Sequence, residues 1–192
     1  MAEKTQKIKA ILFDFMGVLL FPRADYKRDK IVDEIDYAIG KVTDDKLFKK
    51  ETIKKYNLNK TEFNAVLDKI VDKYEPFEPL WSLLPQIRKN YKLAIINNGT
   101  SLTLPKFKSK YYLNNIFDFF VSSAIEGFKK PNRRIYELTI RKLGFKPEEC
   151  LFMDDSLLNV DKAKKLGMST IYWESPQIGF KKFQEFIDIT EA

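Results

Sequence analysis

Five short apolar runs, separated by amphipathic stretches, constrain the fold of this chain more than any other feature. Runs that are apolar on both faces are typical of strands buried inside a parallel sheet. Between two of them, the stretch 132–144 places Tyr136, Ile140 and Leu143 on one helical face. Alternating strands and helices predict an α/β fold with a Rossmann-like parallel sheet and right-handed crossovers. The predicted strands are Lys9–Phe13, Leu93–Ile96, Phe117–Val121, Leu151–Met153 and Thr170–Trp173.

One interval, between Arg23 and Glu75, breaks this alternation because it carries only helical patterns. The clearest pattern covers residues 59–74, where Asn59 and Glu62 can form a capping box, and an earlier one covers residues 31–39. Connectors that contain proline flank the interval and limit the continuation of its helices. We therefore predict a small helical cap at residues 23–78, inserted into a core domain that comprises residues 1–22 and 79–192.

The composition excludes several classes of site. The 192 residues include no histidine, which removes Ser-His-Asp triads and histidine-ligated zinc. The single cysteine, Cys150, begins an apolar run, so we expect it to be a buried structural thiol. The net charge of +7 comes from lysines that alternate with acidic residues along the whole chain. We therefore expect a solvated surface and no nucleic-acid partner.

No signal for a membrane or for export is visible. No apolar run reaches the roughly 18–20 residues that a membrane-spanning helix needs. The first ten residues, MAEKTQKIKA, lack the apolar core of a secretory signal. We expect a cytoplasmic protein with no membrane partner, and the sequence carries no indication of its oligomeric state.

Several predicted strands end in residues that can take part in chemistry. Asp14 closes the first run, and Asp154 and Asp155 close the fourth. The second run ends in the segment 97–100, and Lys130 follows the third run. Ligands of open α/β sheets bind outside the carboxyl ends of the strands, so we expect these side chains to converge. Three carboxylates packed together need a cation, and an all-oxygen ligand set favours Mg²⁺ over zinc.

Taken in this order, the segments resemble the four motifs of the haloacid dehalogenase-like (HAD) hydrolase superfamily, in its branch with a small helical cap. The resemblance covers residues from about 8 to 173. The segment DFMGVL at 14–19 is similar to the first motif, and IINNGT at 95–100 is similar to the second. KKP at 129–131 is similar to the third motif, and FMDDSLLNVDKAKKLGM at 152–168 is similar to the fourth.

The resemblance implies a role for each matched residue. Asp14 would attack a small phosphorylated metabolite and become an aspartyl phosphate. Asn97, Lys130 and the backbone donors near Asn98 and Gly99 would bind the phosphoryl group and neutralise its charge. The Mg²⁺ ligands that the resemblance implies are Asp14, the backbone carbonyl of Met16, Asp155 and the neighbouring Asp154.

The chain departs from the family pattern at Met16. Family phosphatases usually carry a second aspartate two residues after the nucleophile, which protonates the leaving alcohol and then activates water. Loss of such a group typically costs about 10²–10⁴ in rate. Asn97 stands where Ser or Thr is usual, but its amide still donates hydrogen bonds. Asp25, at the start of the predicted cap, is a candidate substitute for the missing acid.

Three functions stay open at this stage. The first is a phosphatase for a monoester with a good leaving group, such as an anomeric or acyl phosphate. The second is a non-catalytic protein that binds a metabolite or a partner and keeps the metal and phosphate sites. The third is a 2-haloacid dehalogenase, which needs no general acid but usually lacks a pair such as Asp154–Asp155. Receiver domains also phosphorylate an aspartate beside Mg²⁺, but their acidic pair falls near the first strand.

Overall fold

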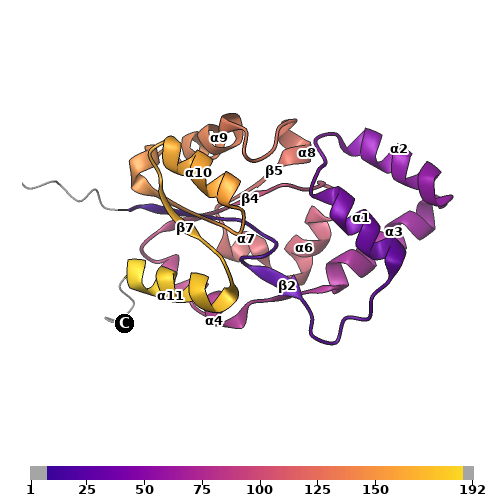
Figure 1. Ribbon diagram of the computed structural model, residues 1–192, viewed down its shortest axis with the longest axis horizontal. Coiled ribbons are helices and arrows are strands. Elements are labelled where there is room, and N and C mark those ends of the chain that lie inside the picture. Colours follow the sequence, from indigo (N-terminus) through magenta and orange to yellow (C-terminus); the bar gives the residue numbers. More distant parts are fainter. Residues whose placement is uncertain (1–7, 188–192) are drawn as a thin grey trace, which may run out of the picture.

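The chain folds around a five-stranded parallel sheet, as the sequence predicts (Figure 1). The computed structural model describes residues 8–187. The strand order is β5-β4-β1-β6-β7, so β1 is central and the residue that follows it, Asp14, lies at the middle of the sheet edge. The strands are β1 Ala10–Phe13, β4 Lys92–Asn97, β5 Phe119–Ser122, β6 Cys150–Asp154 and β7 Ser169–Tyr172.

All five strands differ from their predicted bounds by one or two residues, and two of the shifts have a visible cause. β5 begins at Phe119 and not at Phe117, because Phe117 caps the short helix α7 (Leu113–Ile116). β7 ends at Tyr172, and the next residue, Trp173, is buried in the core after the strand has ended. The apolar runs therefore locate these strands correctly but include buried residues that lie just outside them.

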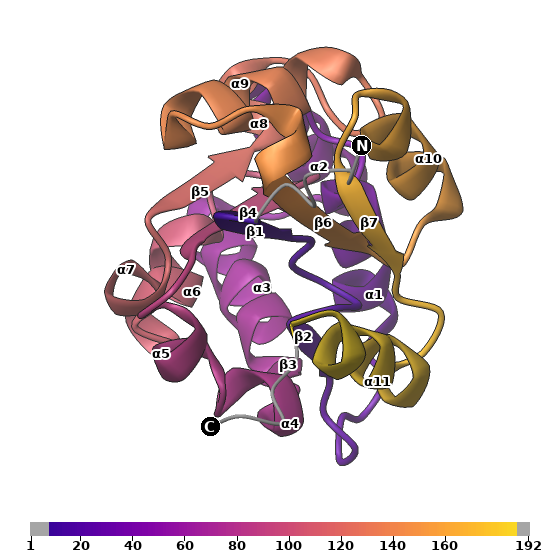
Figure 2. The ribbon, with the colours of Figure 1, turned by 90° about the vertical axis from the view of Figure 1, so that its left-hand side faces the viewer.

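Helices cover both faces of the sheet (Figure 2). Successive side chains of β1 point to opposite faces, so Leu12 joins one apolar cluster and Phe13 joins the other. One face carries α8 (Ser123–Glu126), α9 (Arg133–Leu143) and α10 (Leu157–Lys165), with a 3₁₀ turn at Pro147–Glu149 before β6. The other carries α4 (Glu78–Trp81), α5 (Leu84–Ile87), α6 (Leu104–Lys110), α7 and α11 (Pro176–Ile187).

Three further helices, α1 (Lys30–Ile39), α2 (Asp45–Tyr56) and α3 (Lys60–Asp72), form a helical insert. Figure 1 shows the insert beyond the edge of the sheet at which the strands end. The interval between Arg23 and Glu75 is free of strands only as far as Lys73, because β3 (Tyr74–Pro76) begins at its end and pairs antiparallel with β2 (Leu20–Pro22), and neither strand was predicted. Strands of three residues that contain proline are too short to show an alternating pattern. The domain bounds at residues 23 and 78 stay a prediction.

Side-chain caps start all three helices of the insert. Asp29 and Asp44 accept hydrogen bonds from backbone N–H groups in the first turns of α1 and α2. The predicted capping box of α3 is confirmed. Asn59 Oδ1 accepts from the Glu62 N–H at 3.0 Å, and Glu62 Oε2 accepts from the Asn59 N–H at 2.7 Å. The starts of these helices are thus fixed locally by the sequence.

Polar contacts fasten the helical insert to the loops that follow β4 and β5. Asp45, the first residue of α2, accepts hydrogen bonds from the hydroxyls of Thr100 and Ser101. Ser123 Oγ donates to the Val42 carbonyl at 2.6 Å, in a buried position. The insert therefore contacts the loop that begins with Asn97.

The remaining sequence expectations concern Cys150 and the membrane. Cys150 is fully buried, as predicted, and burial raises the pKa of its thiol to about 12. Within residues 8–187, no helix has both the length and the apolar character that crossing a membrane requires. Most of the polar N-terminal segment lies outside the described residues.

We expect truncation of the central strand to be costly. Leu12→Ala removes a fully buried side chain from β1 and should lower the free energy of unfolding by about 2–5 kcal/mol. The matched control Leu158→Ala changes a side chain that is 65% exposed, and its effect should stay within about 0.5 kcal/mol. Urea denaturation followed by circular dichroism measures both. Equal losses in the two variants would contradict the assigned core.

Candidate active site

A buried lysine joins two of the predicted aspartates. Lys130 lies in the loop between α8 and α9 and is 3% exposed. Its Nζ donates to Asp14 Oδ1 at 2.5 Å and to Asp154 Oδ2 at 2.7 Å. Charge-assisted hydrogen bonds of this kind are the strong class, and a buried ammonium needs them. The structure therefore brings together two carboxylates from the ends of β1 and β6 and a lysine from the loop after α8, as the sequence predicts for this edge.

The Asn98 side chain positions this lysine. Its Oδ1 accepts a hydrogen bond from the Lys130 N–H at 2.8 Å, and its Nδ2 donates to the Lys130 carbonyl at 3.0 Å. Both ends of the amide are thus engaged with the backbone of one residue. The resemblance implied that backbone donors near Asn98 bind the phosphoryl group; the side-chain contacts of Asn98 hold Lys130, and the role of its backbone stays a prediction.

Asp154 is more deeply enclosed than its neighbour Asp155. Asp154 has no exposed surface, and its Oδ1 accepts from the Ser156 N–H at 2.8 Å and from Asn159 Nδ2 at 2.9 Å. Together with the bond from Lys130, both of its oxygens already have protein donors. Asp155 is exposed and receives no such support from the described residues. This difference favours Asp155 as a direct metal ligand and Asp154 as the residue that orients Lys130.

The site holds more negative than positive charge. One carboxylate oxygen from each of Asp14, Asp154 and Asp155 lies within 4.8 Å of the other two. The Lys130 ammonium binds Asp14 and Asp154. Burial and the nearby Asp154 raise the pKa of Asp14 from 3.8 to about 7, although the Lys130 ammonium opposes this shift. Burial would lower the pKa of Lys130, but Asp14 and Asp154 outweigh it and raise that pKa. Burial and Asp154 also raise the pKa of Asp155.

The arrangement fits a divalent cation with oxygen ligands. A cation would relieve the excess of negative charge, and carboxylates with a backbone carbonyl form the ligand set that Mg²⁺ prefers. The Met16 carbonyl accepts no hydrogen bond from the described residues, so it is available as a ligand. Gly17 has a φ of +90°, and a Cβ there would collide with the Asp155 carboxylate. The predicted ligands Asp14, Met16 and Asp155 are thus compatible with one Mg²⁺.

Asn97 and Gly99, two of the predicted hydrogen-bond donors to the phosphoryl group, differ in whether the N–H groups that would donate are already bonded within the protein. The Gly99 N–H donates to Ser123 Oγ at 2.9 Å, so it is already engaged within the protein. Asn97 ends β4 and lines the cavity that contains Asp14. Its amide folds back over Gly99, where a Cβ would collide with Asn97 Nδ2. The glycine therefore makes room for the Asn97 side chain, and the role of Asn97 toward phosphate stays a prediction.

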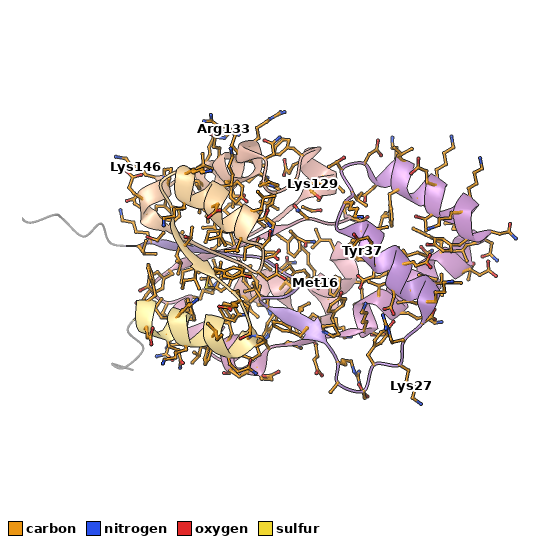
Figure 3. All side chains as sticks on the ribbon, in the orientation of Figure 1. Met16, Lys27, Tyr37, Lys129, Arg133 and Lys146 are labelled. Atoms are coloured by element: carbon orange, nitrogen blue, oxygen red, sulfur yellow. The ribbon has the colours of Figure 1, made fainter. Side chains whose placement is uncertain are left out.

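A cavity of about 600 Å³ connects the carboxylates with the helical insert. Its walls include Asp14, Lys130 and Met16 on one side, and Tyr37 of α1 on the other. Figure 3 shows Met16 and Tyr37 in the region between the sheet and the insert. This volume is typical of a small-molecule site. The arrangement can therefore hold an organic group next to the Asp14 carboxylate.

Asp25 does not take the place of the missing acid. It is exposed and forms two hydrogen bonds of 2.9 Å with the Arg23 guanidinium. Those bonds hold the pKa of Asp25 below its usual range. Asp25 lines a different hollow, which excludes the residues around Asp14. The hypothesis that Asp25 substitutes for an acid at position 16 is therefore wrong.

Sequence reasoning missed the residues that support the site. Asn159 lies in the fourth motif segment, but nothing in its spacing showed that it would bond Asp154. Gly17 could have been noted, because a glycine directly after a metal-binding backbone segment permits close approach of another side chain. Asp45 gave no signal, since an acidic residue at a helix start is ordinary. Its partners Thr100 and Ser101 are distant in the sequence.

Removal of the Asp14 charge should stabilise the metal-free protein. The raised pKa means that the folded state favours protonated Asp14, so wild-type stability falls as the pH rises from about 4 to about 7. In EDTA at pH 8, we expect Asp14→Asn to raise the free energy of unfolding by roughly 1–3 kcal/mol, with a smaller gain at pH 5. Urea denaturation at both pH values measures this.

Mg²⁺ supplies the control for that experiment. It should stabilise the wild-type protein and leave Asp14→Asn nearly unchanged, because the variant lacks a ligand. An Asp14→Asn protein that is less stable than wild type in EDTA, and still stabilised by Mg²⁺, would contradict the assigned electrostatics.

Comparisons with known proteins identify the family of this chain. The family model of the haloacid dehalogenase-like hydrolases matches residues 21–173, a range that includes Asn97, Lys130 and Asp155. The chain is 25% identical over 197 residues to D-ribitol-5-phosphate phosphatase of Bacteroides thetaiotaomicron, covering 88% of this chain and 93% of that protein. It is 34% identical over 99 residues to glyceraldehyde 3-phosphate phosphatase of Methanothermobacter thermautotrophicus, covering 50% of this chain and 43% of that protein.

The chain spans less than half the length of several curated relatives that it matches, including two glyceraldehyde 3-phosphate phosphatases. Among solved structures, it resembles a HAD family enzyme of Bacteroides thetaiotaomicron in complex with magnesium and inorganic phosphate. The TM-score is 0.68 at 19% identity, covering 86% of this chain and 93% of that one. An L-2-haloacid dehalogenase of Xanthobacter autotrophicus shares the fold at a TM-score of 0.66 and 20% identity, covering 96% and 84%. From the family match over most of its length, the chain belongs to the haloacid dehalogenase-like hydrolases.

Proposed function

We propose that the protein is a Mg²⁺-dependent phosphatase that acts on a small phosphate monoester through an aspartyl phosphate at Asp14. The observation that carries this proposal is the buried Lys130, which binds Asp14 and Asp154 beside a third carboxylate. Relatives named as phosphatases of small phosphorylated metabolites support it. Dehalogenases of the superfamily need no metal, so three clustered carboxylates favour the phosphatase.

The two oxygens of Asp14 have different environments. Lys130 binds Oδ1, while Oδ2 accepts no hydrogen bond from the described residues and is not sealed from solvent. Oδ2 would attack the phosphorus, and the bond between phosphorus and the ester oxygen would break as the alcohol leaves. Lys130 and Asn97 would neutralise the charge on the phosphoryl group. Bound Mg²⁺, held by Asp14, Asp155 and the Met16 carbonyl, would polarise the phosphoryl oxygens.

The cavity supplies no evident acid for the leaving group. Met16 cannot donate a proton, and Tyr74 and Lys73 on the insert side are poor donors at neutral pH. Burial and Asp36 raise the pKa of Tyr74. Burial would lower the pKa of Lys73, but the hydrogen bonds that it donates to Asp36 and Asp33 raise that pKa. A substrate whose alcohol leaves without protonation, such as an anomeric or acyl phosphate, is therefore favoured.

The helical insert would act as the lid of this site. Its helices α1 and α3 form the wall of the cavity that faces Asp14, and Asp45 joins α2 to the loop after Asn97. A closed lid excludes water from the charged groups and strengthens their interactions. Because the insert is bonded to the loop after Asn97, closing it over a substrate would also affect the position of that loop beside Asp14.

Phosphate release from p-nitrophenyl phosphate tests the activity, because its phenolate leaves without an acid. We expect release that requires Mg²⁺, stops in EDTA and falls by at least about 10³-fold in Asp14→Asn, which lacks the nucleophile. Asp68→Asn, on an exposed side chain of α3, is the matched control and should keep wild-type activity. Equal release by wild type and Asp14→Asn would refute the proposal.

Met16→Asp tests the reason for the leaving-group preference. The new carboxyl group should raise hydrolysis of simple alkyl phosphates by about 10²-fold or more, because general acid catalysis contributes most when the leaving group is poor. The gain with nitrophenyl phosphate should be much smaller. The rate with an alkyl phosphate would be divided by the rate with nitrophenyl phosphate. If this ratio is the same in wild type and Met16→Asp, residue 16 does not limit the reaction. Met16→Leu controls for the change in size.

A non-catalytic role is the second candidate, and Met16 is the observation that favours it. A protein that retains the metal and phosphate sites without turnover would be stabilised by Mg²⁺ with inorganic phosphate. It would release no phosphate from the aryl ester. Stabilisation without release therefore identifies the binder, whereas Mg²⁺-dependent release identifies the enzyme.

A further inference from the structure

The wall of the cavity that faces Asp14 carries a polar cluster from two elements of the insert and its connector. Lys73, which follows α3, binds Asp36 Oδ2 at 2.7 Å and Asp33 Oδ1 at 2.9 Å. Tyr74 donates its hydroxyl to Asp36 Oδ2 at 2.7 Å. All four residues line the same cavity as Asp14. The Asp36 and Lys73 side chains are each only 12% exposed, so the cluster is held within the wall and is not a mobile surface group.

Asp36 keeps one oxygen free in this cluster. Lys73 and Tyr74 both bind Oδ2, while Oδ1 accepts no hydrogen bond from the described residues. Oδ1 is not among the buried polar atoms without a partner, so it is open to solvent. Because Asp36 lines the cavity, the geometry points to Oδ1 as an acceptor that a bound molecule can reach. The two donors on Oδ2 fix the carboxylate and leave its other oxygen positioned for this role.

The net charge of this wall indicates which kind of substrate group would donate a hydrogen bond to Asp36 Oδ1. The wall carries Asp33 and Asp36 together with Lys73, which pairs with both, and Lys41, whose ammonium lies over the Tyr37 ring at 3.9 Å. Two negative and two positive groups leave this wall near neutral overall. A near-neutral wall favours a hydroxyl, which is an uncharged donor, over an ammonium group of the substrate.

We propose that Asp36 is a specificity-determining residue that accepts a hydrogen bond from a hydroxyl group of the substrate. The inference rests on the proposed phosphatase function and narrows its substrate class. Combined with the leaving-group preference set by Met16, it selects a hydroxyl-bearing compound whose phosphate is on an anomeric carbon, such as an aldose 1-phosphate. Such a molecule places its phosphoryl group at Asp14 and its ring hydroxyls at the opposite wall.

A matched pair of ligands tests this directly. Glucose 1-phosphate and cyclohexyl phosphate each carry a six-membered ring, but only the former bears ring hydroxyls. We would measure their inhibition constants against hydrolysis of nitrophenyl phosphate. Wild type should bind glucose 1-phosphate about tenfold or more tightly than cyclohexyl phosphate, as expected for a hydrogen bond to a charged acceptor.

Asp36→Asn assigns that preference to the proposed residue. Its amide oxygen can still accept from Lys73 and Tyr74, so its NH₂ replaces the acceptor that faces the cavity. The inhibition constant of cyclohexyl phosphate divided by that of glucose 1-phosphate should fall about tenfold, toward one. Tyr74→Phe removes only one donor that fixes Asp36, and it should reduce the ratio by about threefold. This second variant decides the matter if Asp36→Asn does not fold.

Asp68→Asn is the matched control for this test. Asp68 lies on α3 and pairs with Lys106, but it lines a different hollow. The wild-type ratio should persist in this variant. A wild-type ratio near one, or an unchanged ratio in both Asp36→Asn and Tyr74→Phe, would overturn the inference while leaving phosphatase activity established.

A wild-type protein that releases no nitrophenolate would instead refute the proposed function. Calorimetric titration of the two ring phosphates into the Mg²⁺-loaded protein then gives the same ratio without turnover. Preference for glucose 1-phosphate that Asp36→Asn abolishes would support the hydroxyl acceptor in a binding protein. Equal affinities would overturn it.

Discussion

The Lys130 ammonium is the interaction on which the rest of the site depends. It joins Asp14 at the end of the central strand to Asp154 at the end of the neighbouring strand, in a position that is almost fully buried. Asn98, in the loop after β4, fixes the backbone of Lys130, and Asn159 and Ser156 fix Asp154. One lysine cannot balance the negative charge of three carboxylates, so this edge of the sheet is compatible with a further bound cation.

Met16 divides the chemistry of the site into a part that is retained and a part that is lost. In the proposed mechanism, the nucleophile Asp14, Lys130 and the Mg²⁺ ligands act through groups that the Met16 side chain does not alter, because only the Met16 backbone carbonyl would be needed there. Protonation of the leaving group and activation of water both need a side chain that titrates. The expected enzyme therefore forms its aspartyl phosphate readily from activated esters and hydrolyses that intermediate slowly.

Much of the fold and of the central site could be predicted from the sequence, because both depend on patterns that are local along the chain. Buried parallel strands are short apolar runs, and the residue that ends such a run is placed at the sheet edge by topology. The paired strands at Leu20–Pro22 and Tyr74–Pro76 were missed because they are three residues long and contain proline. The hydrogen bonds that Thr100 and Ser101 donate to Asp45, and the cluster around Asp36, join segments whose proximity in space no local pattern encodes.

The measurement that tests this account most directly is trapping of the phosphorylated intermediate. Wild-type protein would be mixed with Mg²⁺ and nitrophenyl phosphate, quenched in acid after a few seconds and digested for mass spectrometry. The account predicts a burst of nitrophenolate and a phosphoryl group on the peptide that contains Asp14, because no base at position 16 speeds its hydrolysis. Steady Mg²⁺-dependent release with no phosphorylated peptide, or a phosphoryl group on another residue, would contradict the assignment of Asp14 as nucleophile and of Met16 as the cause of slow turnover.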